Sequence, residues 1–172
     1  MKIQRTQKGR QTISQSNGFT IIEVVLVLAI AGLIFLMVFI ALPALQRAQR
    51  DTQRKSDLAR IMTQITNYSS NNRGKVPPSL IMPLPSFVTN YLGGTSSSQA
   101  GSEYVDPITG EGYIFQNVGT TAPTADGTIG YSPGYICGSD GAMTPSTTAG
   151  SRQFALVVKL EGQKAPYCVD NR

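Results

Sequence analysis

The sequence predicts an α+β protein in which a long N-terminal helix packs on a small C-terminal antiparallel β-sheet. The helix is expected from Phe19 to about Ser70, because an apolar run over Val24–Leu42 leads into an amphipathic segment over 46–73. Runs rich in β-branched and aromatic residues follow only after residue 112, separated by Gly, Ser and Thr. A helix followed by a group of strands is typical of the α+β class.

The apolar run is long enough to cross a membrane. Val24–Leu42 would form a helix of about 28 Å, close to the roughly 30 Å of a hydrocarbon core. A cleaved secretory signal is the alternative, but its apolar region usually has about 7–15 residues. The small-residue sites at 29–31 and 41–44 also lie inside the run or at its edge. We therefore expect a membrane-spanning helix over residues 19–45.

The charge of the chain is concentrated at its start. The formal net charge is +5, and the first eighteen residues contribute four of these charges with no acid, at Lys2, Arg5, Lys8 and Arg10. The rest of the chain holds 11 basic and 10 acidic residues. Basic flanks of a membrane helix stay in the cytoplasm, so residues 1–18 read as a cytoplasmic leader and the C-terminal part is expected to be exported.

The composition argues against an enzyme. The chain has no histidine, which removes the commonest general base and zinc ligand. It has no Ser-x-x-Lys motif and no phosphate-binding loop. We therefore expect no catalytic residues and no cofactor. Residues 74–172 hold five basic and seven acidic residues, so strong nucleic-acid binding by this part is not expected.

Glu23 stands at the head of the apolar run, where an acid is costly. A charge near mid-bilayer costs about 2.5–3.5 kcal/mol, and less toward the interface. One interpretation is that Glu23 lies hydrated in the headgroup layer. The other begins with a cut after Gly18, which would make Phe19 a positively charged N-terminus. A second subunit would then offer that amino group to Glu23.

These residues resemble the processing motif of the type IV prepilin family, which includes type II secretion pseudopilins and competence pilins. The similarity covers residues 9–45: a basic leader ending in Gly18, then Phe19-Thr20-Ile21-Ile22-Glu23 at the head of an apolar helix. It implies cleavage between Gly18 and Phe19 by prepilin peptidase and N-methylation of Phe19. It also implies that Thr20 and Glu23 act in assembly.

The resemblance extends to two further positions of the helix. Gly32 matches a glycine where the family's helix loosens in the filament. Pro43 matches a helix-breaking proline, although it stands about one turn later than in the family. Both imply local flexibility of the helix.

The resemblance implies a pilin fold with a cleaved leader (1–18), a membrane and filament-core helix (19–45), a helical stem (46–73) and a globular β head (74–172). The implied function is that of a structural subunit of a type IV pilus-like filament, in adhesion, twitching motility or DNA uptake. A pseudopilin of a type II secretion system is the alternative, and a binding domain anchored by a single span is a more distant one.

The implied partners are identical or related pilin subunits, prepilin peptidase, the pilus or secretion assembly machinery and membrane lipid. Before assembly, the chain would be a single-pass cytoplasmic membrane protein with an exported C-terminus. After assembly, it would belong to an extracellular pilus or to a periplasmic or cell-wall filament.

The stem should pack on the head through one apolar stripe. Its members recur at helical spacing: Leu58, Ile61, Met62, Ile65 and Tyr68. Residues 46–60 also hold five basic and two acidic residues. These charges are expected either to contact acidic neighbours or lipid phosphates, or to form a solvated helix face. The helix should end near 71–74, before Pro77-Pro78.

Four strands are expected in the head, over Tyr113–Val118, Gly130–Cys137, Phe154–Leu160 and Tyr167–Val169. In an exported protein, Cys137 and Cys168 are expected to form a disulfide rather than remain as two buried thiols. Residues 138–150 would then form an exposed loop inside it.

A turn over Asp106–Gly110 should open the first strand. We expect no metal site in the head, because no EF-hand spacing is present. The candidate calcium ligands by residue type are Asp106, Glu111, Asp126 and Asp140.

Overall fold

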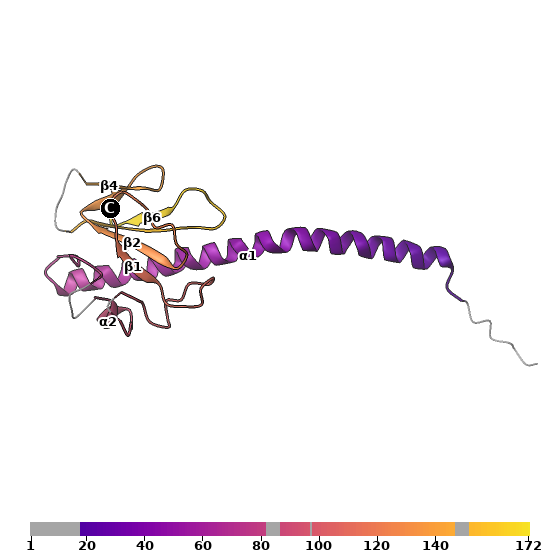
Figure 1. Cartoon of the computed structure of the whole chain (residues 1–172), viewed down its shortest axis with the longest axis horizontal. Coiled ribbons are helices and arrows are strands. Elements are labelled where there is room, and N and C mark those ends of the chain that lie inside the picture. The colour runs from indigo at the N-terminus through magenta and orange to yellow at the C-terminus, as the bar shows by residue number, and fades with distance from the viewer. Residues whose placement is uncertain (1–17, 82–86, 97, 147–151) are drawn as a thin grey trace, which may run out of the picture. The chain divides into compact units, whose positions relative to one another are not determined.

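A computed structural model of the chain describes residues 18–81, 87–96, 98–146 and 152–172. The expected leader, apart from Gly18, lies outside the described residues. The elements are α1 (Ile21–Asn71), α2 (Phe87–Tyr91), β1 (Ile114–Asn117), β2 (Thr128–Pro133), β3 (Tyr135–Cys137), β4 (Met143–Pro145), β5 (Phe154–Val158) and β6 (Tyr167–Asp170) (Figure 1). The α+β class with one long N-terminal helix is confirmed.

Helix α1 is continuous over 51 residues, a length of about 77 Å. It ends where the sequence predicts. Arg73 and Gly74 both adopt a positive φ, of 57° and 79°, and the Gly74 amide donates to the Ser69 carbonyl at 2.8 Å. This left-handed cap satisfies a carbonyl of the last turn. The chain divides into two compact units between Ala41 and Leu42, so the stem belongs to the same unit as the head.

The first part of α1 is apolar and long enough to cross a membrane. Its large side chains are exposed, from Val24, which is 49% exposed, to Leu42, which is 48% exposed. In water such a surface would be unfavourable, because apolar area stabilises a protein only when it leaves water. This segment therefore requires lipid or other protein around it.

The main sheet has the strand order β1-β2-β5-β6. The β2–β5 and β5–β6 pairs are antiparallel, as expected. The prediction of a wholly antiparallel sheet is wrong at one edge, because β1 pairs with β2 in parallel, with Ile114 opposite Thr128. Residues 118–127 return along the sheet before β2 begins, and a parallel pair requires such a crossover.

The prediction of a single strand over Gly130–Cys137 is also wrong. Gly134 adopts a φ of 76°, which ends β2 and turns the chain out of the main sheet. The residues after it form β3, which pairs with β4 in a separate two-stranded sheet. Strand β4 lies inside the segment expected to be an exposed loop, and Met143 in it is buried.

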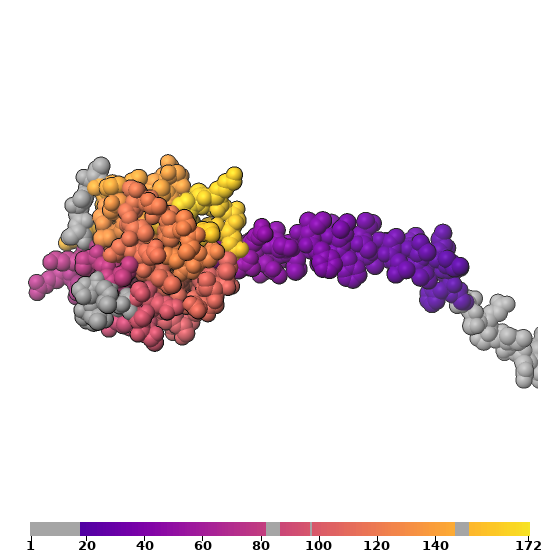
Figure 2. Space-filling model, in the orientation of Figure 1, coloured from indigo at the N-terminus to yellow at the C-terminus, as the bar shows by residue number. Residues whose placement is uncertain are grey.

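Strand β5 is buried on both faces, which organises the head in layers. On one face, Phe154, Leu156 and Val158 belong to a core with the helical residues Leu58, Ile61 and Ile65. On the other face, Ala155 and Val157 pack with Met143 and the disulfide cysteines. The main sheet is therefore sandwiched between α1 and the β3–β4 ribbon, and Figure 2 shows the head covering this half of α1. The predicted stripe on the stem is confirmed.

The disulfide between Cys137 and Cys168 is present. It joins β3 to β6 across a sequence separation of 31 residues. Closing a loop of this size lowers the conformational entropy of the unfolded chain and so stabilises the folded state. The bridge ties the two-stranded ribbon to the last strand of the main sheet.

Replacing both cysteines, as in C137S/C168S, should lower the free energy of unfolding by about 3–4 kcal/mol. The measurement is urea unfolding of the full chain in detergent, followed by tyrosine fluorescence because the chain has no tryptophan. A loss below about 1 kcal/mol would contradict an entropic role for the bridge.

Candidate functional site

The expected processing junction is exposed. The side chain of Phe19 is 88% exposed, and a Cβ added to Gly18 would meet no atom within 4 Å. Helix α1 begins only at Ile21, so the bond between Gly18 and Phe19 lies outside the helix. An extended, accessible peptide bond is what a protease requires.

Thr20 and Glu23 form a capping box at the start of α1. The Glu23 carboxylate accepts from the Thr20 amide at 3.1 Å and from the Thr20 hydroxyl at 3.0 Å. In return, the Glu23 amide donates to the Thr20 hydroxyl at 3.4 Å. This is the reciprocal arrangement of an N-cap residue and the third helical residue. The sequence analysis missed it, although Thr-x-x-Glu before an apolar run is its signal.

Glu23 therefore has a structural role at the start of α1. Its carboxylate accepts from the Thr20 amide, which has no acceptor within the helix, and its charge lies at the positive end of the helix dipole. Phe19 directly precedes the cap residue. A new amino group at Phe19 would therefore arise within one turn of this carboxylate.

The two positions expected to give flexibility lie in different surroundings. Gly32 lies in the exposed apolar stretch, where a Cβ would meet nothing within 4 Å. Pro43 lies inside α1, next to the division between the two compact units. Because proline has no amide hydrogen, the carbonyl of Phe39 loses its helical donor. The helix is therefore weakest at this turn.

The second polar centre is a group of charged contacts between stem and head, here called the clamp: Arg50, Asp51, Arg54, Asp106 and Glu161. At its middle, the Arg54 and Asp106 side chains are fully buried. Arg54 donates from Nε and Nη2 to the two carboxylate oxygens, at 2.6 and 3.1 Å. Its Nη1 also donates to the carbonyl of Lys159, at 3.2 Å.

Two further contacts extend the clamp to the loop after β5. Arg50 forms a bidentate ion pair with Glu161, with both distances 2.7 Å. The Asp51 carboxylate accepts from the amides of Glu161 and Gly162, both at 2.8 Å. Two consecutive residues of α1, Arg50 and Asp51, therefore hold one loop.

The clamp shifts the acidity of its carboxyl groups. Burial alone would raise the pKa of Asp106, but hydrogen bonds from Arg54 and from the amides of Thr109 and Ile108 lower it below its ordinary value. The hydrogen bonds from Arg50 lower the pKa of Glu161. Both groups are therefore ionised at neutral pH. In contrast, burial raises the pKa of Asp57, which accepts from the hydroxyl of Tyr113 at 3.3 Å.

The charges of the stem were expected to contact other molecules or to remain solvated. Neither expectation describes Arg54, which is 1% exposed, or Arg50, which is paired with Glu161. Arg60 is also paired, with Asp57 at 3.3 Å. Arg47 remains exposed and forms no ion pair with any described residue. A helical sequence alone does not show which polar residues meet a distant part of the chain.

The calcium candidates are not brought together. Asp106 is occupied by Arg54, whose Nη2 also lies 3.6 Å from Asp126. Glu111 is exposed, and Asp140 accepts from the amide of Ala142 in the turn between β3 and β4. Within the described residues, no three acidic, histidine or cysteine side chains gather at one point. The guanidinium of Arg54 therefore occupies the position beside Asp106 and Asp126 where a calcium ion would have to bind.

Comparisons of this chain with protein-family models, with curated proteins and with solved structures find no match.

Replacing Arg54 with methionine should lower the free energy of unfolding by about 3–5 kcal/mol, because it leaves the buried Asp106 carboxylate without its cation. The matched control is R60M, in which the lost ion pair is half exposed and the expected loss is within about 1 kcal/mol. The double variant R54M/D106L should recover part of the loss. Equal losses in R54M and R60M would show that the buried pair has no special role.

Proposed function

We propose that this chain is a structural subunit of a type IV pilus-like filament, made as a precursor and assembled through α1. The observation that carries the proposal is the junction at the head of α1. There, an accessible Gly18–Phe19 bond precedes a capping box and a long exposed apolar surface. Each of these features has a use in a subunit that is first held in a membrane, then cut and packed against copies of itself.

Cleavage would create a charge where one is needed. Hydrolysis of the Gly18–Phe19 bond leaves an ammonium on Phe19, next to the cap residue Thr20. In an assembly, the ammonium of one subunit would meet the Glu23 carboxylate of another in apolar surroundings. Leaving either charge unpaired there is costly, so the pair would favour the correct register between subunits. A head-to-tail contact of this kind repeats without closing and forms a filament.

The apolar part of α1 supplies the attraction between subunits. Its side chains from Val24 to Leu45 are exposed, so they remain free to pack in lipid before assembly and on other helices afterwards. The clamp holds the head on the stem part of α1 and not on this segment. Assembly therefore requires no unfolding of the head.

A pseudopilin of a type II secretion system is the second candidate, and it would use the same junction. It is favoured by the end of α1 at Asn71, followed by Gly74 and Pro77, and by the Asp106-Pro107 turn, which resemble pseudopilin heads. A membrane-anchored binding domain, in contrast, would keep its leader or lose the whole apolar segment.

The N-terminus of the mature protein tests the proposal directly. We expect mass spectrometry of the protein from its native membrane to find a chain that begins at Phe19 and carries a methyl group on its amino nitrogen. An intact Met1, or a start beyond Ala44, would overturn the proposal.

Variants at the capping box separate the role of the Glu23 charge from that of the cap. E23Q keeps an oxygen acceptor for Thr20 but removes the charge, so cleavage should proceed while filament yield falls at least tenfold. T20A removes the cap hydroxyl and keeps the charge, so it should assemble much better than E23Q. Electron microscopy and sedimentation of filaments measure both. Normal filaments from E23Q would exclude a role for the charge.

A further inference from the structure

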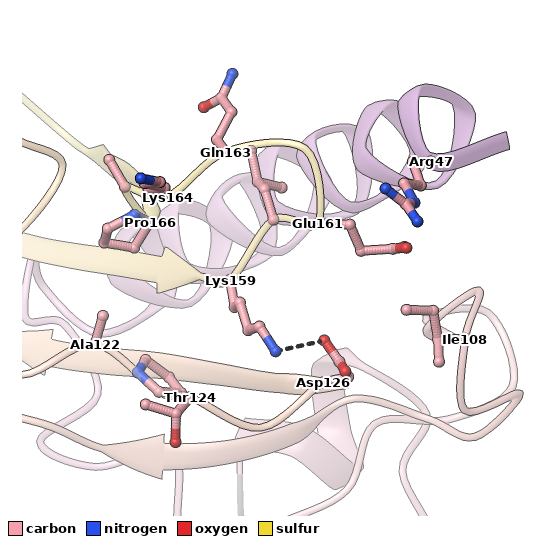
Figure 3. Close-up of a pocket in the computed structure, with 13 residues that line it drawn as sticks. Arg47, Ile108, Ala122, Thr124, Asp126, Lys159, Glu161, Gln163, Lys164 and Pro166 are labelled. Carbon is pink, nitrogen blue, oxygen red and sulfur yellow. Dashed lines mark ion pairs between the residues drawn. The ribbon is translucent and has the colours of Figure 1, made fainter. Parts of the chain in front are cut away.

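A cavity of about 760 Å³ lies in the head beside the stem (Figure 3). It is open to solvent and is lined by Arg47 of α1, by Ile108, by residues 122–124 and 126 before β2, and by residues 159–161 and 163–166 after β5. All of these residues belong to one compact unit. A second cavity of about 430 Å³ shares Arg47 and Gln163 with the first and reaches Lys55.

Two residues of the loop that lines both cavities, Glu161 and Gly162, are fixed in place. The Asp51 carboxylate accepts from two of its amides, and Arg50 holds its Glu161 side chain through two hydrogen bonds. Little conformational freedom remains to be lost when a ligand enters. A preformed site of this kind binds more tightly than one that must be ordered first.

The cations at the first cavity are less well neutralised than its acids. Glu161 is paired with Arg50, and Asp126 lies 3.4 Å from Lys159 and 3.6 Å from Arg54. In Figure 3, Arg47 approaches from α1, while Lys159 and Lys164 come from the loop after β5. Among the described residues, neither Arg47 nor Lys164 forms an ion pair, and both are exposed. The cavity therefore offers an anion two exposed cations, of which Arg47 also lies near enough to Glu161 to help lower the pKa of that carboxyl.

The position of Arg47 in α1 identifies the anion. Arg47 follows Leu42, the last residue of the apolar run, by five residues, or about 7.5 Å of helix. The headgroup region adds roughly 5–7 Å on each side of the hydrocarbon core. When the run spans a membrane, Arg47 therefore lies at the depth of the lipid phosphates. Cations near an anionic membrane surface each contribute to binding.

We propose that this cavity binds the headgroup of an anionic phospholipid from the membrane leaflet next to the head. The inference rests on the membrane-spanning part of the proposed function and not on processing or filament formation. Arg47 would meet the lipid from α1 and Lys164 from the loop after β5, and the clamp fixes residues 161 and 162 of that loop.

The test uses the full chain in detergent with equal amounts of dioleoyl phosphatidylglycerol and dioleoyl phosphatidylcholine. These lipids differ only in their headgroups. Native mass spectrometry gives the ratio of the two bound lipids, and the wild type should prefer phosphatidylglycerol. R47Q/K164Q should reduce the preference by roughly fivefold for each cation removed. The control K75Q/R152Q removes the same charge from exposed residues that do not line the cavity, and should keep the wild-type ratio.

Three results would overturn the inference. The first is an equal ratio in the wild type, and the second is the same decrease in both double variants. The third is displacement of phosphatidylglycerol by millimolar inorganic phosphate, which would show a site for free anions. If instead R47Q/K164Q only weakens self-association in sedimentation, the cavity binds a second copy and the lipid assignment is wrong.

The failures of the two proposals can be told apart. The lipid ratio is measured on the unprocessed chain, so a chain that is never cut after Gly18 in its native membrane can still show the preference. If cleavage and filaments occur but the ratio is equal, only the lipid inference falls. Thermal unfolding of both double variants checks that the head remains folded.

Discussion

The head depends on one buried contact, between the guanidinium of Arg54 and the carboxylate of Asp106. It joins three distant parts of the chain, because Arg54 also donates to the carbonyl of Lys159 at the end of β5. A buried ion pair adds little stability compared with apolar residues, but it strongly penalises any arrangement that separates its partners. A rotated or shifted helix would keep much of the apolar contact and lose this pair. The pair therefore selects one register of stem and head, which Asp51 and Arg50 then extend to the loop after β5.

Structural features that follow from the periodic spacing of apolar residues could be predicted from the sequence. Features that depend on contacts between distant parts of the chain could not. Leu58, Ile61 and Ile65 recur at helical spacing, so their burial against the sheet followed from the period alone. The parallel pairing of β1 with β2 did not, because alternation along a strand says nothing about the direction of its neighbour. Gly134 interrupts the strand-like run Gly130–Cys137. Its positive φ belongs to the turn from β2 into the second sheet, which the run itself does not reveal. In the sequence, Arg54 cannot be distinguished from a solvated arginine on a helix surface. Its burial becomes apparent only in the folded chain, where Asp106 lies against it.

The sequence predicts a processing junction at Gly18 from a local signal, and this stays a prediction. The capping box of Thr20 and Glu23 was not predicted, although its Thr-x-x-Glu signal is also local. In the proposed filament, the carboxylate that caps its own helix would also meet an amino group of another chain.

The proline inside α1 has a mechanical consequence. An α-helix resists stretching through its successive backbone hydrogen bonds. At Pro43 one of these bonds is absent, so extension under load begins at this turn. The turn lies before Arg50, where the clamp begins, so the helix can yield there without pulling the head apart. If the proposed filament forms, the proline would act as a compliant element that lets the helix extend before the head unfolds.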